Sequence, residues 1–126
     1  MTSLYFVYGT LKKDMRNHSV LKKINANFLA QCKTADNYPM FDLGNGFPYL
    51  QEEPGNGNII HGELFEIDNK FEKHLDDFEG VPELYYRGTI TIIYNKQNIL
   101  VNCYFITDSL SNEELNQTEM LDNWID

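Results

Sequence analysis

The sequence predicts a one-domain α+β protein, built on a small, mixed and strongly bent β-sheet or barrel with two or three short flanking helices. Many short runs are apolar or alternate between apolar and polar residues, as strands do, whereas few segments have helical spacing. The 126 residues are close to the commonest domain size, and no repeat or linker divides them. We therefore expect a single domain over residues 1–126, with its strands around a common core.

The first part of the chain predicts a strand, a short helix and a second strand. Residues 4–8 are almost wholly apolar and are closed by Gly9, which is typical of a strand buried on both faces and followed by a tight turn. Asn17 can cap a helix over residues 18–24, which carries an apolar stripe. We expect the next strand over residues 28–33.

The middle of the chain predicts brief strands separated by turns. Residues 37–58 are rich in turn-forming residues and contain short apolar pieces at 40–41 and 47–50. A longer strand is expected over residues 59–67. Gly62 inside it predicts a bulge or a close approach of another part of the backbone.

A helix is predicted over residues 69–78. Asp68 can cap its start, while Gly80 fits the position just past its end and Pro82 prevents continuation. One face is expected to carry Phe71, Leu75 and Phe78.

A hairpin and a short helix are predicted after it. Residues 86–94 alternate with the period of a half-buried strand, and residues 95–98 provide the turn into a last strand over residues 99–106. The run Ser-Asn-Glu-Glu at 111–114 is a capping-box pattern, which predicts a short helix there.

Composition narrows the possible partners and compartment. The formal net charge is −9 and the pI is near 4.6, which disfavours binding to nucleic acid or to anionic membranes. The first residues lack the features of a secretory signal, and no apolar run approaches the ~20 residues of a membrane span. We expect a reduced, soluble, cytoplasmic protein and a monomer. Cys32 and Cys103 are expected to be small core residues.

Several kinds of chemistry have no sequence support. The three histidines show no ligand spacing with one another or with cysteine, so no metal site is predicted. No glycine-rich phosphate loop and no Gly-x-Ser-x-Gly motif is present. Thr10 stands at a strand-to-turn junction but has no His or Asp partner nearby in the sequence. Carboxylates are the remaining candidates.

Glu79 is the carboxylate with the most unusual surroundings. It falls at the end of the predicted helix, where the carbonyl end of the helix dipole disfavours negative charge. Nearby aromatic residues can supply an apolar wall, and both effects would raise its pKa toward the range useful for proton transfer near neutrality. The alternative is an ordinary surface glutamate before a C-cap glycine, and local chemistry leaves both open. Asp76 and Asp77 are expected to be solvated helix charges. Arg87 could pair with either of them and fix the turn, and the alternative is that it contacts the substrate.

The turn that follows the first strand is the second candidate feature. A buried strand that ends in a glycine turn leaves several backbone N–H groups pointing outward together. Such a group can hold a carboxylate or a developing oxyanion without a charged side chain. The alternative is a purely structural turn. The residues concerned are Tyr8, Gly9, Thr10 and Leu11.

Together these features resemble the γ-glutamylcyclotransferase superfamily, and most closely its branch that acts on γ-glutamylamines. The resemblance rests on the stretch 6–13, on Asn17-His18 and on the stretch 75–79 with Tyr85 and Arg87. It covers about residues 5–106, whereas the acidic segment 107–126 does not match the expected pattern. It implies a small barrel-like mixed sheet with flanking helices, in agreement with the fold expected from the residues.

The resemblance also implies an activity and its residues. The α-amino group of a γ-glutamyl unit attacks its own γ-carbonyl, forming 5-oxoproline and releasing the attached amine, as from ε-(γ-glutamyl)-lysine. Glu79 would act as general base and then as general acid, and no metal or other cofactor is implied. The implied substrate-binding residues are Tyr8, Gly9, Thr10, Leu11 and Tyr85, although Tyr85 and Tyr86 alternate and only one can face the pocket. The alternatives are a cyclotransferase for γ-glutamyl-α-amino acids and a non-catalytic small-ligand-binding domain.

Overall fold

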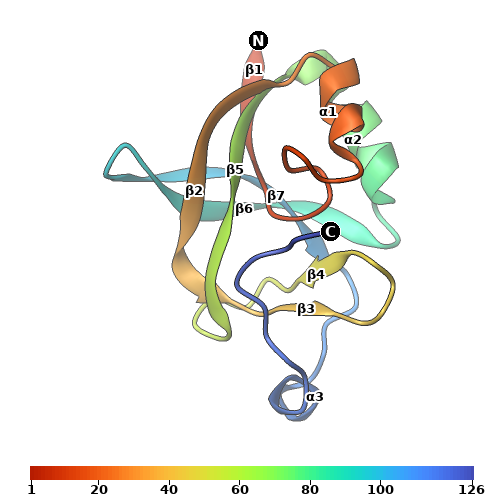
Figure 1. Cartoon of the computed structure of the whole chain (residues 1–126), viewed down its shortest axis with the longest axis vertical. Coiled ribbons are helices and arrows are strands. Elements are labelled where there is room, and N and C mark those ends of the chain that lie inside the picture. The colour runs from red at the N-terminus through yellow and green to blue at the C-terminus, as the bar shows by residue number, and fades with distance from the viewer.

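Five strands close into a barrel in the computed structural model, which describes all residues from Met1 to Asp126. Around the barrel the strands follow the order β1 (Thr2–Val7), β5 (Asn58–Asp68), β2 (Asn27–Tyr38), β6 (Tyr85–Tyr94) and β7 (Gln97–Ile106). A separate two-stranded sheet contains β3 (Met40–Asp42) and β4 (Pro48–Leu50). Figure 1 shows helices α1 (His18–Lys23) and α2 (Glu72–Glu79) at one end of the molecule and α3 (Asn112–Asn116) at the other. The predicted fold class is confirmed.

The barrel consists of two well-paired parts joined at two short seams. One part is the antiparallel sheet β1-β5-β2, and the other is the hairpin of β6 and β7, whose ten register pairs run from Tyr85↔Ile106 to Tyr94↔Gln97. Between β1 and β7 the register contains one parallel pair, Tyr5↔Asn102. Between β2 and β6 it contains two pairs. Side chains therefore contribute strongly to holding the two parts together.

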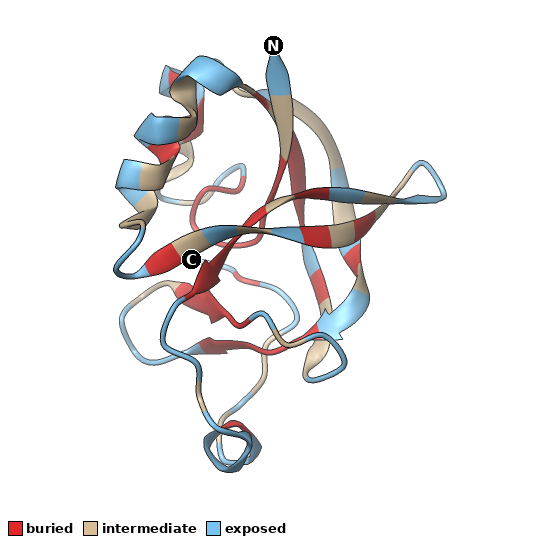
Figure 2. Cartoon of the chain, turned by 180° about the vertical axis from the view of Figure 1, so that it is seen from behind, coloured by how far each residue is buried: buried red, intermediate tan, exposed pale blue.

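The second half of β1 is buried on both faces, as its apolar run predicts. Tyr5 and Val7 belong to one hydrophobic cluster, which also contains Leu21 of α1 and Leu75 of α2. Phe6 and Tyr8 belong to a second cluster, formed mainly by barrel strands. Figure 2 shows the buried stretches along the strands and the exposed outer faces of the helices. The end of β1 thus lies between the two cores, where the chain enters the turn at Gly9.

The helices differ from the prediction in three details. The segment expected over residues 69–78 is divided into a 3₁₀ turn, η1 (Asn69–Phe71), and α2, which extends to Glu79. Asn17 precedes α1 but makes no capping bond, because its side-chain amide donates instead to Thr10 Oγ1 at 3.0 Å. Phe78 was expected on the buried face of α2 and is 41% exposed.

Three other local predictions hold. The Asp68 side chain accepts a bond from the Lys70 backbone N–H at the start of η1, and Ser111 forms a complete capping box on α3. Gly62 marks a close approach, because a Cβ there would lie 2.5 Å from both Phe6 Cζ and the Val7 carbonyl oxygen.

The segment after α3 has no regular structure and packs along the loop that precedes α1. Lys12 is buried, and its ammonium donates to the side-chain oxygen of Asn123 at 2.8 Å and to the carbonyl oxygen of Trp124 at 2.7 Å. The Arg16 backbone N–H donates to the Asp126 carboxylate. These contacts tie the C-terminal segment to the loop directly after Leu11.

Lys12→Met is expected to destabilise the fold by roughly 1–3 kcal/mol, because it leaves two acceptors without their charged donor. Urea unfolding monitored by circular dichroism measures this. Lys23→Met, at an exposed position of α1, is the matched control and is expected to change stability by less than about 0.5 kcal/mol. Equal losses in the two variants would contradict this role of Lys12.

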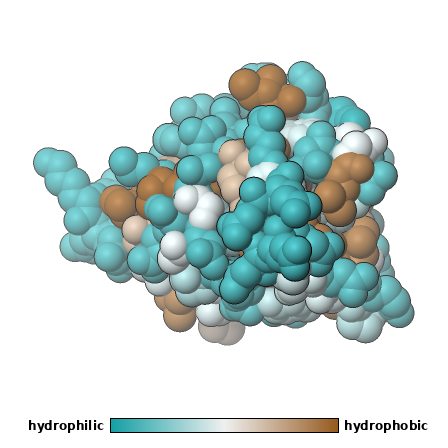
Figure 3. All heavy atoms as spheres, turned by 90° about the horizontal axis from the view of Figure 1, so that it is seen from below, coloured by the Kyte–Doolittle hydropathy of each residue, from teal (hydrophilic) through white to brown (hydrophobic).

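The surface is largely polar, in keeping with the net charge of −9. The face seen in Figure 3 is mainly hydrophilic, with small separate hydrophobic patches. None of the helices has the length and apolar character that crossing a membrane requires.

Candidate active site

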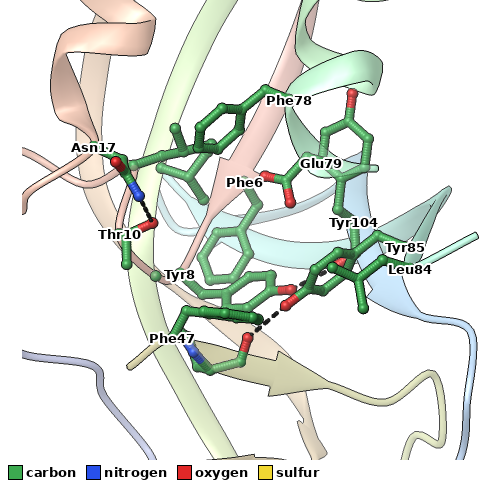
Figure 4. Close-up of a pocket in the computed structure, with 14 residues that line it drawn as sticks. Phe6, Tyr8, Thr10, Asn17, Phe47, Phe78, Glu79, Leu84, Tyr85 and Tyr104 are labelled. Atoms are coloured by element: carbon green, nitrogen blue, oxygen red, sulfur yellow. Dashed lines mark hydrogen bonds between the residues drawn. The ribbon is translucent and has the colours of Figure 1, made fainter. Parts of the chain in front are cut away.

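A pocket of about 250 Å³ lies where β1, the end of α2 and the starts of β4 and β6 meet. Fourteen residues line it, nine of them hydrophobic, and none carries a cationic side chain. All six residues singled out from the sequence are among them: Tyr8, Gly9, Thr10, Leu11, Glu79 and Tyr85. Figure 4 shows Glu79 on one side of this pocket and the turn with Thr10 on the other. The structure therefore joins the two candidate features in one site.

Glu79 reaches the pocket because of how α2 ends. Gly80 adopts the left-handed conformation, with φ of 72°, and its N–H bonds to the carbonyls of Asp76 and Asp77. The Val81 N–H also donates to the Asp76 carbonyl at 3.0 Å. This arrangement satisfies the carbonyls of Asp76 and Asp77 and turns the chain away at once, which is why glycine is favoured at position 80. The last side chain of α2 is left facing the pocket.

The surroundings of Glu79 favour its protonated form. Burial, and second the negative charge of Asp76, raise the pKa of Glu79 to about 8. No protein group donates a hydrogen bond that would favour the ionised Glu79 carboxylate. A carboxyl with this pKa can take up and return a proton near neutral pH. The sequence-based expectation of a raised pKa agrees with this in its direction, with burial as the largest cause and the charge of Asp76 as the second.

The turn after β1 presents backbone N–H groups without partners. The N–H groups of Gly9, Thr10 and Leu11 donate to no other group of the protein, whereas the carbonyls of Gly9 and Thr10 accept from Lys12 and Asn17. Consecutive unpaired N–H groups attract an anion without adding a charged side chain. Gly9 is also in close approach to β4, because a Cβ there would lie 2.9 Å from Pro48 Cγ.

Two tyrosines form fixed walls of the pocket. The Tyr8 hydroxyl donates to the Tyr104 carbonyl oxygen at 2.7 Å, and the Tyr85 hydroxyl donates to the Pro48 carbonyl oxygen at 2.8 Å (Figure 4). Burial raises the pKa of both phenols, so they remain neutral donors. Tyr86 points elsewhere and donates to Glu52. Of the two adjacent tyrosines, Tyr85 is thus the one in the pocket.

Sequence reasoning missed several lining residues and misjudged one neighbour. Phe47, Leu84 and Tyr104 line the pocket but had no local signal, since each is one apolar residue among many. Asp76 was expected to be a solvated helix charge. That expectation was wrong, because its carboxylate is only 21% exposed, accepts a bond from the Tyr104 hydroxyl and pairs with Arg87. Its partners come from β6 and β7, which helical periodicity does not reveal.

The fold and site define a small barrel with one high-pKa carboxyl opposite an unpaired N–H turn. Residues 5–126 match the family model described as "Gamma-glutamyl cyclotransferase, AIG2-like". The chain belongs to this family, so the resemblance seen in the sequence is confirmed. The match continues to residue 126, so the expectation that the segment 107–126 lies outside the family pattern was wrong.

Individual relatives agree with this family. A human protein named gamma-glutamylaminecyclotransferase is 38% identical over 94 residues, which cover 71% of this chain and 61% of that protein. The bovine protein of the same name is 31% identical over 123 residues, covering 94% of this chain and 73% of the relative. The crystal structure of a mouse AIG2-like protein superimposes with a TM-score of 0.82 at 27% identity, covering 98% of this chain and 88% of that one. The chain spans about three fifths of the length of the human relative that it matches.

Proposed function

We propose that the protein is a γ-glutamylamine cyclotransferase, which converts compounds such as ε-(γ-glutamyl)-lysine into 5-oxoproline and the free amine. The observation that carries the proposal is the placement of Glu79, partly buried and with a pKa of about 8, in the same pocket as the unpaired N–H groups of residues 9–11. The names of the human and bovine relatives, both gamma-glutamylaminecyclotransferase, support the substrate class.

The reaction needs one group that moves a proton twice. The α-amino group of the substrate gives a proton to the Glu79 carboxylate and attacks the γ-carbonyl carbon, forming the ring C–N bond. The bond between that carbon and the departing amine then breaks as Glu79 returns the proton to the departing nitrogen. An amide nitrogen is a very poor leaving group without this proton, so a carboxyl that titrates near neutrality suits both steps.

The remaining lining residues suit binding and ring closure. The N–H groups of Gly9, Thr10 and Leu11 would bind the glutamyl carboxylate or the developing oxyanion. Tyr8 and Tyr85 are held by their own hydrogen bonds, so they offer a rigid surface against which the glutamyl chain can fold. Holding amine and carbonyl of one molecule in contact supplies much of the rate in an intramolecular reaction.

The charge of the pocket favours amines over α-amino acids as leaving groups. An α-amino acid would place a carboxylate next to the scissile amide, close to Glu79, and the lining has no cation to accept it. In ε-(γ-glutamyl)-lysine the leaving nitrogen is at the end of the lysine side chain, so its carboxylate lies far from the reacting atoms. This is the reason for preferring γ-glutamylamines to γ-glutamyl-α-amino acids.

The proposal is tested with purified protein and three substrates: ε-(γ-glutamyl)-lysine, a simple γ-glutamyl alkylamine and a γ-glutamyl-α-amino acid. We expect 5-oxoproline and the free amine in equal amounts from the first two, measured by chromatography, and much less from the third. A preference for the third would instead favour a cyclotransferase for γ-glutamyl-α-amino acids. No turnover of any of them would favour a non-catalytic binding domain.

The activity is expected to depend on pH through Glu79. Because its pKa is about 8, the carboxylate that accepts the amine proton is scarce at pH 6, where only about 1% is ionised, and reaches one half near pH 8. We therefore expect kcat/KM for ε-(γ-glutamyl)-lysine to rise with pH through about 8, in initial-rate measurements from about pH 5.5 to about pH 9. A limb near pH 4.5, where an ordinary glutamate titrates, would contradict the assignment.

A further inference from the structure

A cluster of charged and phenolic side chains ties one face of α2 to three strands of the barrel. Arg87 of β6 donates from Nη1 to the Tyr5 hydroxyl of β1 at 2.8 Å and also contacts the Glu72 carboxylate. Its Nη2 lies 3.3 Å from Asp76 Oδ2. The other oxygen of Asp76 accepts a bond from the Tyr104 hydroxyl of β7. Asp76 is therefore held from two directions.

This cluster meets the pocket at two places. Asp76 and Glu79 are three residues apart on α2, so their side chains are neighbours on the helix surface. Tyr104, which bonds to Asp76, also lines the pocket. In Figure 4 its ring stands beside Glu79, with the hydroxyl directed toward α2.

Asp76 is the one charged group that acts on Glu79 at neutral pH. The titratable groups that face Glu79 from the packed elements are Tyr8 at the end of β1, Tyr85 of β6, and Cys103 and Tyr104 of β7. Burial raises the pKa of each of these four, so each is neutral. The charge of Asp76 adds to the effect of burial on the pKa of Glu79. Arg87 acts on Asp76 and balances part of its charge.

We propose that Asp76, fixed by Arg87 and Tyr104, is a positioning residue whose negative charge tunes the proton affinity of Glu79. The catalytic role of this effect rests on the proposed function, in which the Glu79 carboxylate must be basic enough to take the amine proton. A second carboxylate nearby disfavours ionisation of Glu79, so Glu79 binds a proton more tightly. Arg87 limits this effect, so a useful fraction of Glu79 remains ionised.

The test measures Glu79 directly, without turnover. Side-chain carboxyl ¹³C shifts of glutamate-labelled protein are followed over pH in the unmutated protein, in Asp76→Asn and in Arg87→Met, and the Glu79 signal is assigned by its loss in Glu79→Gln. We expect its pKa to fall in Asp76→Asn and to rise in Arg87→Met, by roughly half a unit or more in each case. In the double variant the value should lie between those of the two single variants, because the charges of Asp76 and Arg87 act on Glu79 with opposite signs.

Asp77→Asn is the matched control, since Asp77 is 65% exposed, pairs with Lys73 and lies next to Asp76 on α2. In Asp77→Asn the pKa of Glu79 is expected to be the same as in the unmutated protein. The rising limb of kcat/KM should move with the NMR value, to lower pH in Asp76→Asn and to higher pH in Arg87→Met. If Asp76→Asn does not fold, the upward shift in Arg87→Met supports the proposal alone.

Unchanged titration of Glu79 in both folded variants, or shifts in the same direction, would overturn the inference. This failure is distinct from failure of the proposed function. If the unmutated protein turns over no γ-glutamyl compound but the opposite shifts are seen, the function is overturned and the electrostatic role of Asp76 is supported.

Discussion

Glu79→Gln is expected to reduce turnover of ε-(γ-glutamyl)-lysine by about 10³-fold or more, because the amide can neither accept the amine proton nor return it to the leaving nitrogen. The side chain keeps its size, so the pocket retains its shape. Steady-state release of lysine measures the loss, and a ligand-detected NMR titration with the same substrate checks that binding persists. Glu83→Gln makes the same chemical change at an exposed position of the turn after α2 and should keep full activity. Undiminished turnover in Glu79→Gln would contradict the proposed role of Glu79 in proton transfer.

At high pH, Glu79→Gln should have a larger unfolding free energy than the unmutated protein. The same unfolding measurement verifies that the variant folds. The pKa of Glu79 is about 8 in the folded protein and near 4.5 when unfolded, so the folded state binds the proton more tightly. Unfolding free energy therefore falls as pH rises from about 4.5 to about 8, by at most about 5 kcal/mol at 1.36 kcal/mol per unit. A glutamine side chain does not ionise, so the unfolding free energy of Glu79→Gln does not fall for this reason. We expect the stability difference between Glu79→Gln and the unmutated protein to grow in favour of Gln between pH 5 and pH 9.

Gly62→Ala is expected to destabilise the protein by about 3 kcal/mol, at the upper end for overpacking. The added methyl group would lie 2.5 Å from the Val7 carbonyl oxygen and from Phe6 Cζ. A backbone oxygen inside a paired strand cannot move without disturbing the register of β1 on β5. Phe6 also lines the pocket, so activity should fall together with stability. Urea unfolding and the turnover assay measure the two effects.

Gly88→Ala is the matched control for this change. Gly88 also lies in a strand, but its added methyl group would meet side chains and no backbone: the edge of the Phe105 ring at 3.0 Å and Glu52 Oε2 at 3.5 Å. We expect a loss of about 1 kcal/mol or less, because a side chain can give way more easily than backbone. Equal effects at the two glycines would show that the approach of β1 to Gly62 is not tight.

Local patterns predicted the parts of the fold that local chemistry determines. The apolar run ending at Gly9 specifies β1, and Asp68, Gly80 and Pro82 delimit the helical segment whose last residue is Glu79. Caps, left-handed glycines and apolar runs act within a few residues, so they can be read in order along the chain. Both main features of the candidate site, the turn after β1 and Glu79 at the end of α2, depend on such local signals.

Contacts between distant residues were not predictable in the same way. Arg87 was expected to pair with Asp76 or Asp77, and it pairs with Asp76, but its bonds to Glu72 and Tyr5 depend on barrel closure. Tyr104 enters the pocket because β7 lies beside β1, a pairing that no periodicity specifies. The segment after α3 lacked a pattern, yet it holds the loop at Lys12 through contacts more than 100 residues apart.

The short seam between β1 and β7 has a consequence for how the pocket can be lost. The pocket spans this seam, with the N–H turn on the side of β1 and Tyr104 on the side of β7, and the Tyr8 hydroxyl bridges them at 2.7 Å. An opening confined to the seam would leave the hairpin and the three-stranded sheet intact, together with most of the circular dichroism signal. It would nevertheless dismantle the site. Turnover therefore reports barrel closure more sensitively than secondary-structure content does. On mild heating, turnover should be lost at a lower temperature than the circular dichroism signal.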